Sequence, residues 1–311
     1  MTLAPEVQTR GLGLVRYLYD LALHQSRQSG LRRATAILTF HDAVEMFLVL
    51  GLQHHDVYNA KRLYRFEDYW TELARVGVQV TQKGTMESLS RVRANFKHHA
   101  ITPSPSALED ARVHVRDFFT ENLPNVFGLN FEDLSLASAV PFERSRLHLE
   151  KAEKLMAEAK CDDALGDIAF AFELLIDDYE ASRLRGRSKV SPDRFSDVPL
   201  WDLGNLDLTN RGGPSLPREI ARRLDDFGRN IRQKIASIEK ALELVSLGID
   251  YERYVRFIGL TPTIVKHGPD PAAWGRSEWH DERPPTIDEC RFCFDFVIES
   301  ALRLQELVSE G

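Results

Sequence analysis

Cysteine is scarce in this sequence of 311 residues, and the few thiols present do not form a disulfide pattern. Cys161 stands alone and Cys290 and Cys293 lie three positions apart, so their odd count and spacing predict no structural disulfides. Long apolar runs are also missing, because charged residues or His interrupt every hydrophobic stretch before it reaches the roughly 18–20 residues of a membrane span. Residues 1–6 lack the basic-then-apolar layout of a signal peptide. These absences predict a cytoplasmic protein with no membrane partner.

The sequence also has no excess of positive charge. The net charge is −7 and the sequence pI is near 5.8. A dedicated sequence-independent nucleic-acid binder depends on many Lys and Arg contacts to phosphates, so this composition argues against that class. An enzyme that needs only a small basic cluster is still allowed. The sequence also has no Gly-rich phosphate loop, no nucleophile elbow and no Walker motif.

What the sequence does contain is helical periodicity, with 43% hydrophobic and 28% charged residues. No alternating strand pattern appears, so the predicted fold class is all-α. Thr286 and Glu289 have the spacing of a capping box and predict the start of the last helix. The predicted helices span about 5–28, 31–53, 66–76, 85–99, 106–121, 142–159, 162–183, 218–247 and 286–308.

The chain is long enough for about two domains, and we expect two helical bundles, residues 1–138 and 139–311. Polar segments at about 184–217 and 268–285 are predicted to be long loops of the second bundle. Residues 43–48 read AVEMFL and residues 171–176 read AFELLI, which suggests a diverged internal repeat. The alternative is a chance similarity between two amphipathic helices.

One predicted helix ends in a cluster of chemically active side chains, because residues 91–99 read RVRANFKHH. With the helical context around it, including FHDAVE at residues 40–45, this stretch resembles the motif of HEPN domains, in which four to six residues separate an Arg from a His. The resemblance covers residues 8–122. It implies metal-independent RNA cleavage in a bacterial defence or toxin context, with no cofactor and no metal ligands.

The resemblance implies a role for each polar side chain of the motif. His98 would be the general acid and base, and Arg91 or Arg93 would hold the scissile phosphate. If the helix stays regular to His98, Arg91 and Asn95 share its stripe; if the helix ends early, Arg93 is the match by spacing. Asn95 would orient the site. The flanking RNA-binding residues would be Lys97 and His99.

The second half of the chain lacks this motif. Arg253 and Arg256 begin a similar stretch, but no His follows at the required interval. A complete HEPN-type site would then need the first bundles of two chains, so a homodimer is expected, and the second bundle is free to bind a protein partner.

A rival interpretation stays open. Lys and His at the end of a helix offset its macrodipole without any catalysis, and the acidic chain would then be a non-catalytic helical adaptor for a protein partner.

Overall fold

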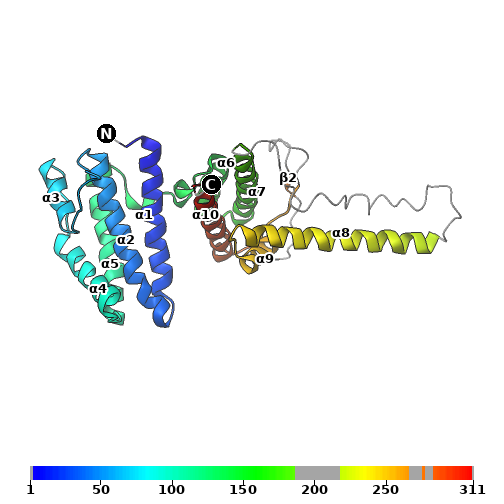
Figure 1. The fold of residues 1–311 in the computed structure, drawn as a ribbon, viewed down its shortest axis with the longest axis horizontal. Coiled ribbons are helices and arrows are strands. Elements are labelled where there is room, and N and C mark those ends of the chain that lie inside the picture. The colour runs from blue at the N-terminus through cyan, green and yellow to red at the C-terminus, as the bar shows by residue number, and fades with distance from the viewer. Residues whose placement is uncertain (1–2, 186–217, 266–274, 277–282, 310–311) are drawn as a thin grey trace. The chain divides into compact units, whose positions relative to one another are not determined.

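The computed structural model describes residues 3–185, 218–265, 275–276 and 283–309 (Figure 1). The chain is all-α, as predicted. Within those ranges the strand structure is one antiparallel pairing of two residues each, between β1 (Ile264–Val265) and β2 (Gly275–Arg276). The chain divides into two compact units, Met1–Ala157 and Glu158–Gly311. The predicted boundary near residue 138 falls inside the first unit.

The first unit is built around one central helix, α2, which packs against α1, α3, α4 and α5. Two short 3-10 turns and α6 complete the unit. The elements are α1 (Pro5–Ser26), α2 (Gly30–His54), α3 (Asp68–Arg75), α4 (Lys83–His99), α5 (Pro105–Phe127), η1 (Phe131–Asp133), η2 (Leu136–Ala139) and α6 (Glu143–Ala157).

The predicted helices are confirmed, and within the first unit the largest difference from the predicted bounds lies at the end of α5. This helix continues six residues beyond the predicted end at residue 121 and contains Pro124 in its last turns. It ends at Gly128, whose φ of 70° is the left-handed conformation common after a helix.

The central helix α2 is long and apolar enough to cross a membrane by length and composition alone. However, 61% of its most apolar window is buried inside the unit. Phe47 lies at the centre of this core, with its ring edge-on to Phe118 and Phe119 at centroid separations of 5.4 and 5.7 Å. Each such buried aromatic contributes about 1.5–3 kcal/mol to folding. The apolar surface of α2 is therefore explained by packing within a folded unit.

The segment between α5 and α6 packs onto α1. An Nη1 of Arg16 donates to the carbonyl of Phe131 at 3.0 Å, and the backbone of Ala139 passes directly over Gly13. The carboxylate of Glu153 on α6 accepts from the backbone amide of Leu136 at 3.1 Å. These contacts place residues 131–157 with the first unit.

The second unit contains α7 (Cys161–Arg185), α8 (Arg218–Ser246), α9 (Tyr251–Leu260) and α10 (Ile287–Ser309). Phe172, Phe257 and Phe296 form its aromatic core, with centroids 4.9–5.4 Å apart. The two similar hexapeptides, residues 43–48 and 171–176, lie on α2 and α7, the core helices of their units.

The capping box at the start of α10 is confirmed. The amide of Glu289 donates to the Thr286 hydroxyl at 3.3 Å, and the amide of Thr286 donates back to the Glu289 carboxylate at 2.8 Å. All three cysteines are free thiols. The predicted loops at 184–217 and 268–285 lie largely outside the described residues.

Candidate functional site

The helix that carries the RVRANFKHH stretch is regular to its end. α4 runs without interruption from Lys83 to His99 and stops at Ala100, whose φ is 55°. The amide of Ile101 then donates to the carbonyl of Asn95 at 3.1 Å, which closes the last turn. Spacing along this stretch is therefore helical spacing, and the condition that favoured Arg91 over Arg93 holds.

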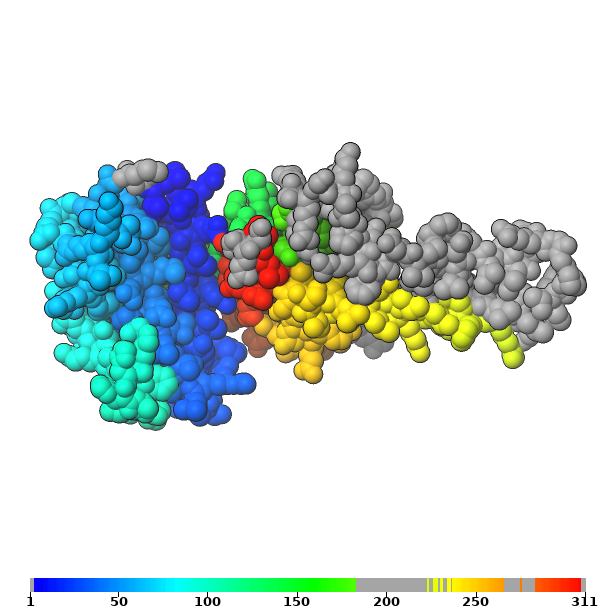
Figure 2. Space-filling model, viewed as in Figure 1, coloured from blue at the N-terminus to red at the C-terminus, as the bar shows by residue number. Residues whose placement is uncertain are grey.

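Three of the predicted site residues share one exposed stripe of α4. Arg91, Asn95 and His98 are separated by four and three positions, so their side chains lie on one face of the helix, and all three are exposed. Lys97 and His99 are exposed beside them. The last turns of α4 thus present a compact group of cationic and polar side chains. Figure 2 shows the α4–α5 junction as part of the surface of the first unit.

Arg91 and Arg93 differ in their surroundings. Arg91 is exposed, and one of its Nη atoms donates to the Ser88 hydroxyl at 2.8 Å, one turn back along the helix. Arg93 is half-buried, and its Nε is buried with no hydrogen-bond acceptor in the described part of the chain. The stripe that contains His98 therefore includes Arg91, while the Nε of Arg93 is shielded from solvent.

A hollow of about 370 Å³ lies between α2, α4 and α5. Its floor is apolar, formed by buried side chains that include Ile37, Met86 and Leu89. Its rim is polar and includes Ser88, the acceptor of the Arg91 hydrogen bond. The size falls near the lower end of ligand pockets, ~300–1,000 Å³. The rim also includes Asp110 and His114 of α5, which the sequence analysis did not single out.

A further cation lies at the same end of the unit. Arg33, in the first turn of α2, has a buried Nε with no acceptor within the described ranges. It lies near the first turns of α5, because it helps to lower the pKa of Glu109, which is lowered mainly by a hydrogen bond from Arg112. In Figure 1 the start of α2, the end of α4 and the start of α5 lie at one end of the unit.

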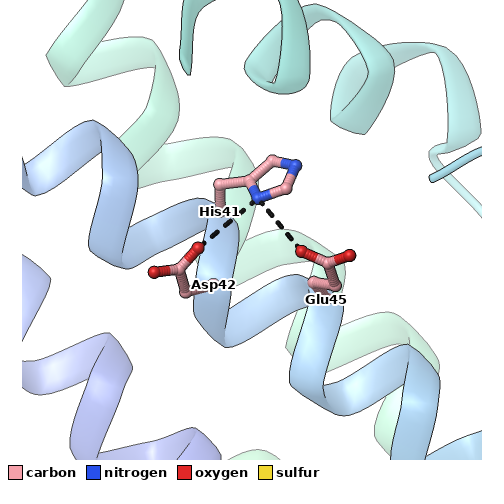
Figure 3. A group of neighbouring side chains, drawn as sticks. All are labelled: His41, Asp42 and Glu45. Atoms are coloured by element: carbon pink, nitrogen blue, oxygen red, sulfur yellow. Dashed lines mark ion pairs between the residues drawn. The ribbon is translucent and has the colours of Figure 1, made fainter. Parts of the chain in front are cut away.

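A second group of polar side chains lies in the middle of α2, where His41, Asp42 and Glu45 converge (Figure 3). The Nδ1 atom of His41 lies 3.7 Å from a carboxylate oxygen of Asp42 and 3.7 Å from one of Glu45. These distances are too long for hydrogen bonds, and among the described residues neither ring nitrogen of His41 has a hydrogen-bond partner. His41 is only 3% exposed. A buried imidazole without a hydrogen bond therefore faces two carboxylates.

Aromatic side chains that follow α2 in the sequence enclose this group on one side. The Phe66 ring stacks on the His41 ring at 4.6 Å, and the Tyr69 hydroxyl donates to Oε1 of Glu45 at 3.2 Å. Burial, and then the neighbouring Glu45 carboxylate, raise the pKa of Tyr69, so its hydroxyl stays a donor. The sequence analysis used residues 40–45 only for their resemblance to a HEPN hairpin. The His–Glu separation of four positions was the feature that could have revealed the site.

The described part of the second unit offers no comparable group. Arg253 forms an ion pair with Glu299, and within the described residues no His accompanies it. Cys290 and Cys293 are fully buried, and burial raises the pKa of the Cys293 thiol to about 12. His267 and His280 lie outside the described residues. The expectation from the resemblance that the chain has no metal ligands stays a prediction.

Comparison with known proteins adds no further assignment, because no protein-family model, curated protein or solved structure matches this chain.

Proposed function

We propose that this protein is a metal-independent endoribonuclease of the HEPN type, which acts in the cytoplasm as a homodimer in a bacterial defence or toxin context. The observation that carries the proposal is the exposed stripe of Arg91, Asn95 and His98 at the end of an unbroken helix. An imidazole and a guanidinium that reach the same solvent-exposed face can engage one RNA backbone.

The chemistry follows from these side chains. His98 removes the proton of a ribose 2′-hydroxyl, and the 2′ oxygen attacks the adjacent phosphorus. The bond from phosphorus to the 5′ oxygen breaks, the leaving oxygen takes up a proton, and the products are a 2′,3′-cyclic phosphate and a 5′-hydroxyl. Arg91 binds the phosphate and stabilises the charge that builds on its oxygens. Asn95, between them on the stripe, donates to the substrate.

The surroundings of the stripe fit an RNA ligand. Lys97 provides a cationic contact and His99 a hydrogen-bond donor for flanking phosphates, and Arg33 has an unused donor at the same end of the unit. The hollow lined by Ser88, the hydrogen-bond partner of Arg91, combines an apolar floor with a polar rim, which suits an unstacked base. These groups are local, so they are compatible with the overall net charge of −7.

A second chain is part of the proposal. One stripe supplies one imidazole, whereas the reaction needs a base for the 2′-hydroxyl and an acid for the leaving oxygen. Two first units that face each other would bring two copies of His98 to one scissile phosphate. The second unit is then available to bind a protein partner.

The adaptor alternative is less well supported. It expects His98 to be buried against its own bundle and Arg93 to pair with a local carboxylate. His98 is exposed, and Arg93 forms no ion pair within the described ranges. An exposed imidazole is accessible to a substrate, as the enzyme requires.

The test compares the full-length wild type with His98→Ala on total RNA in EDTA. The matched control is His24→Ala, because His24 is also an exposed histidine in the last turn of its helix. We expect fragments with 2′,3′-cyclic phosphate ends from wild type and His24→Ala, and none from a folded His98→Ala. Equal cleavage by His98→Ala would contradict the assignment of His98, and no cleavage by wild type at any protein concentration would support the adaptor.

A further inference from the structure

We propose that His41, Asp42 and Glu45 bind one divalent transition-metal ion on α2, at a site separate from the α4 stripe. The three available donor atoms, one imidazole nitrogen and two carboxylate oxygens, all lie within 4.8 Å of one another (Figure 3). A metal ion bonded at about 2.0–2.2 Å to each would draw them closer, which small side-chain rotations achieve.

Helical geometry brings two of the ligands together. His41 and Glu45 are separated by one helical turn and lie on the same face of α2, the spacing that paired metal ligands use on a helix. Asp42 is adjacent in sequence, and its carboxylate reaches to the same imidazole nitrogen. Three ligands on one side of an ion leave its other coordination positions for water.

The burial of His41 is the observation that distinguishes this group from an ordinary acidic surface. Its Nδ1 has no hydrogen-bond partner at 3% exposure, and a buried polar atom without a partner is costly. A metal ion between this nitrogen and the carboxylates would satisfy all three groups at once. The alternative is an internal ion pair between an imidazolium and the two carboxylates.

The charges around the cluster favour a cation. Among the described residues, no Lys or Arg forms an ion pair with Asp42 or Glu45, although the nearby Glu72 is held by Arg62 and Arg75. Within the described ranges, these two carboxylates thus lack a permanent cationic partner. Mixed nitrogen and oxygen ligands suit Mn²⁺, Fe²⁺ or Zn²⁺ better than Ca²⁺ or Mg²⁺, which prefer oxygen ligands.

The second contact of Glu45 orients it for this role. The Tyr69 hydroxyl holds Oε1, so Oε2 is the oxygen that faces His41. Tyr69 is therefore a positioning residue outside the ligand set. The stacked Phe66 ring covers the imidazole. The side chains of Asp42 and Glu45 are 55% and 38% exposed, so an ion can reach the site from solvent.

The experiment titrates metal-stripped, full-length protein with Mn²⁺ and follows the free ion by electron paramagnetic resonance. We expect one Mn²⁺ per chain, with affinity at least about tenfold lower in Asp42→Asn and in Glu45→Gln, which each lose one ligand charge. Tyr69→Phe keeps every charge and should weaken binding by about 10–100-fold. The control Asp117→Asn removes the same charge from an exposed position of α5 and should bind like wild type.

Ligation of the metal ion by His41 can be measured separately. Pulsed resonance of the bound Mn²⁺ should show coupling to one nitrogen, which disappears in His41→Gln. Absence of stoichiometric Mn²⁺ binding by wild type would overturn the proposal in favour of the ion pair. Unchanged affinity in folded Asp42→Asn and Glu45→Gln would also overturn it. None of these outcomes depends on RNA cleavage, so this proposal and the proposed function fail separately.

Discussion

Arg91 and His98 lie seven residues apart on one exposed stripe of α4, two helical turns from each other, and the helix between them is unbroken. At 1.5 Å per residue their backbones are roughly 10 Å apart. Both side chains are long enough to reach toward a ligand laid along the helix. This relationship underlies the choice between the two candidate arginines.

The two arginines should therefore respond differently to substitution. Arg91→Ala removes an exposed phosphate ligand, so we expect RNA cleavage to fall by about 10²–10³-fold, with stability changed by less than about 0.5 kcal/mol. Arg93→Ala should reduce cleavage less and change stability more, because Arg93 is half-buried. Cleavage rates and urea unfolding of both variants provide the comparison, with Arg65→Ala as an exposed control. Equal rates for Arg91→Ala and wild type would show that the stripe does not bind the phosphate.

An active site formed by a dimer predicts that specific activity depends on protein concentration. If two first units form the site, the specific activity of the wild type should rise with concentration and reach a plateau as the dimer forms. Cleavage assays over a dilution series, paired with sedimentation at the same concentrations, measure both quantities. Specific activity that stays constant while the protein is monomeric would refute the composite site.

The packing of residues 136–139 onto α1 predicts that one added methyl group at Gly13 lowers the stability of the first unit. A Cβ on Gly13 would lie 2.6 Å from the backbone nitrogen of Ala139. Gly13→Ala should therefore destabilise the first unit by about 1–3 kcal/mol. In Gly84→Ala the added Cβ meets nothing within 4 Å, so this control should be neutral or stabilising by up to about 1 kcal/mol. Urea unfolding distinguishes them, and a neutral Gly13→Ala would contradict the assignment of this segment to the first unit.

The capping box of α10 predicts that the stability of the folded protein depends on pH. Hydrogen bonds from Arg283 and then from Thr286 lower the pKa of Glu289 to about 2, from an ordinary value of 4.5. The ionised carboxylate thus contributes stability above pH 4.5, and this contribution is lost as the pH falls toward 2. Unfolding of Glu289→Gln and wild type should differ at pH 7 and converge near pH 2. The exposed first-turn control, Asp288→Asn, should show a smaller change with pH; a Glu289→Gln difference that is independent of pH would be inconsistent with this assignment.

Much of the fold could be predicted from local sequence. Apolar periodicity identified every described α-helix except α9, and the Thr286–Glu289 spacing identified the start of α10, because both features depend on residues within a few turns. The extension of α5 through Pro124 was missed, since proline ordinarily indicates a break. The docking of residues 131–139 on α1 was missed as well, because it depends on contacts more than 100 positions apart in the sequence.

The same distinction applies to the candidate sites. The α4 stripe could be predicted because its spacing lies within one helix. The sequence left Arg91 and Arg93 as alternatives, and only the observed end of α4 distinguishes them. The group on α2 depends on a contact between His41 and Phe66, which are 25 positions apart, and on the burial that this contact creates. Periodicity carries no information on which distant ring will cover a histidine.

The most direct test of the central claim is the chemistry of the RNA ends. Total RNA is incubated in EDTA with wild type, His98→Ala or His24→Ala, and the 3′ ends of the fragments are then analysed. An end that carries a 2′,3′-cyclic phosphate resists ligation until the cyclic phosphate has been opened and removed. The account predicts such ends with wild type and His24→Ala, and their absence with folded His98→Ala. Cyclic phosphate ends produced equally by His98→Ala, or no cleavage by wild type at any concentration, would contradict it.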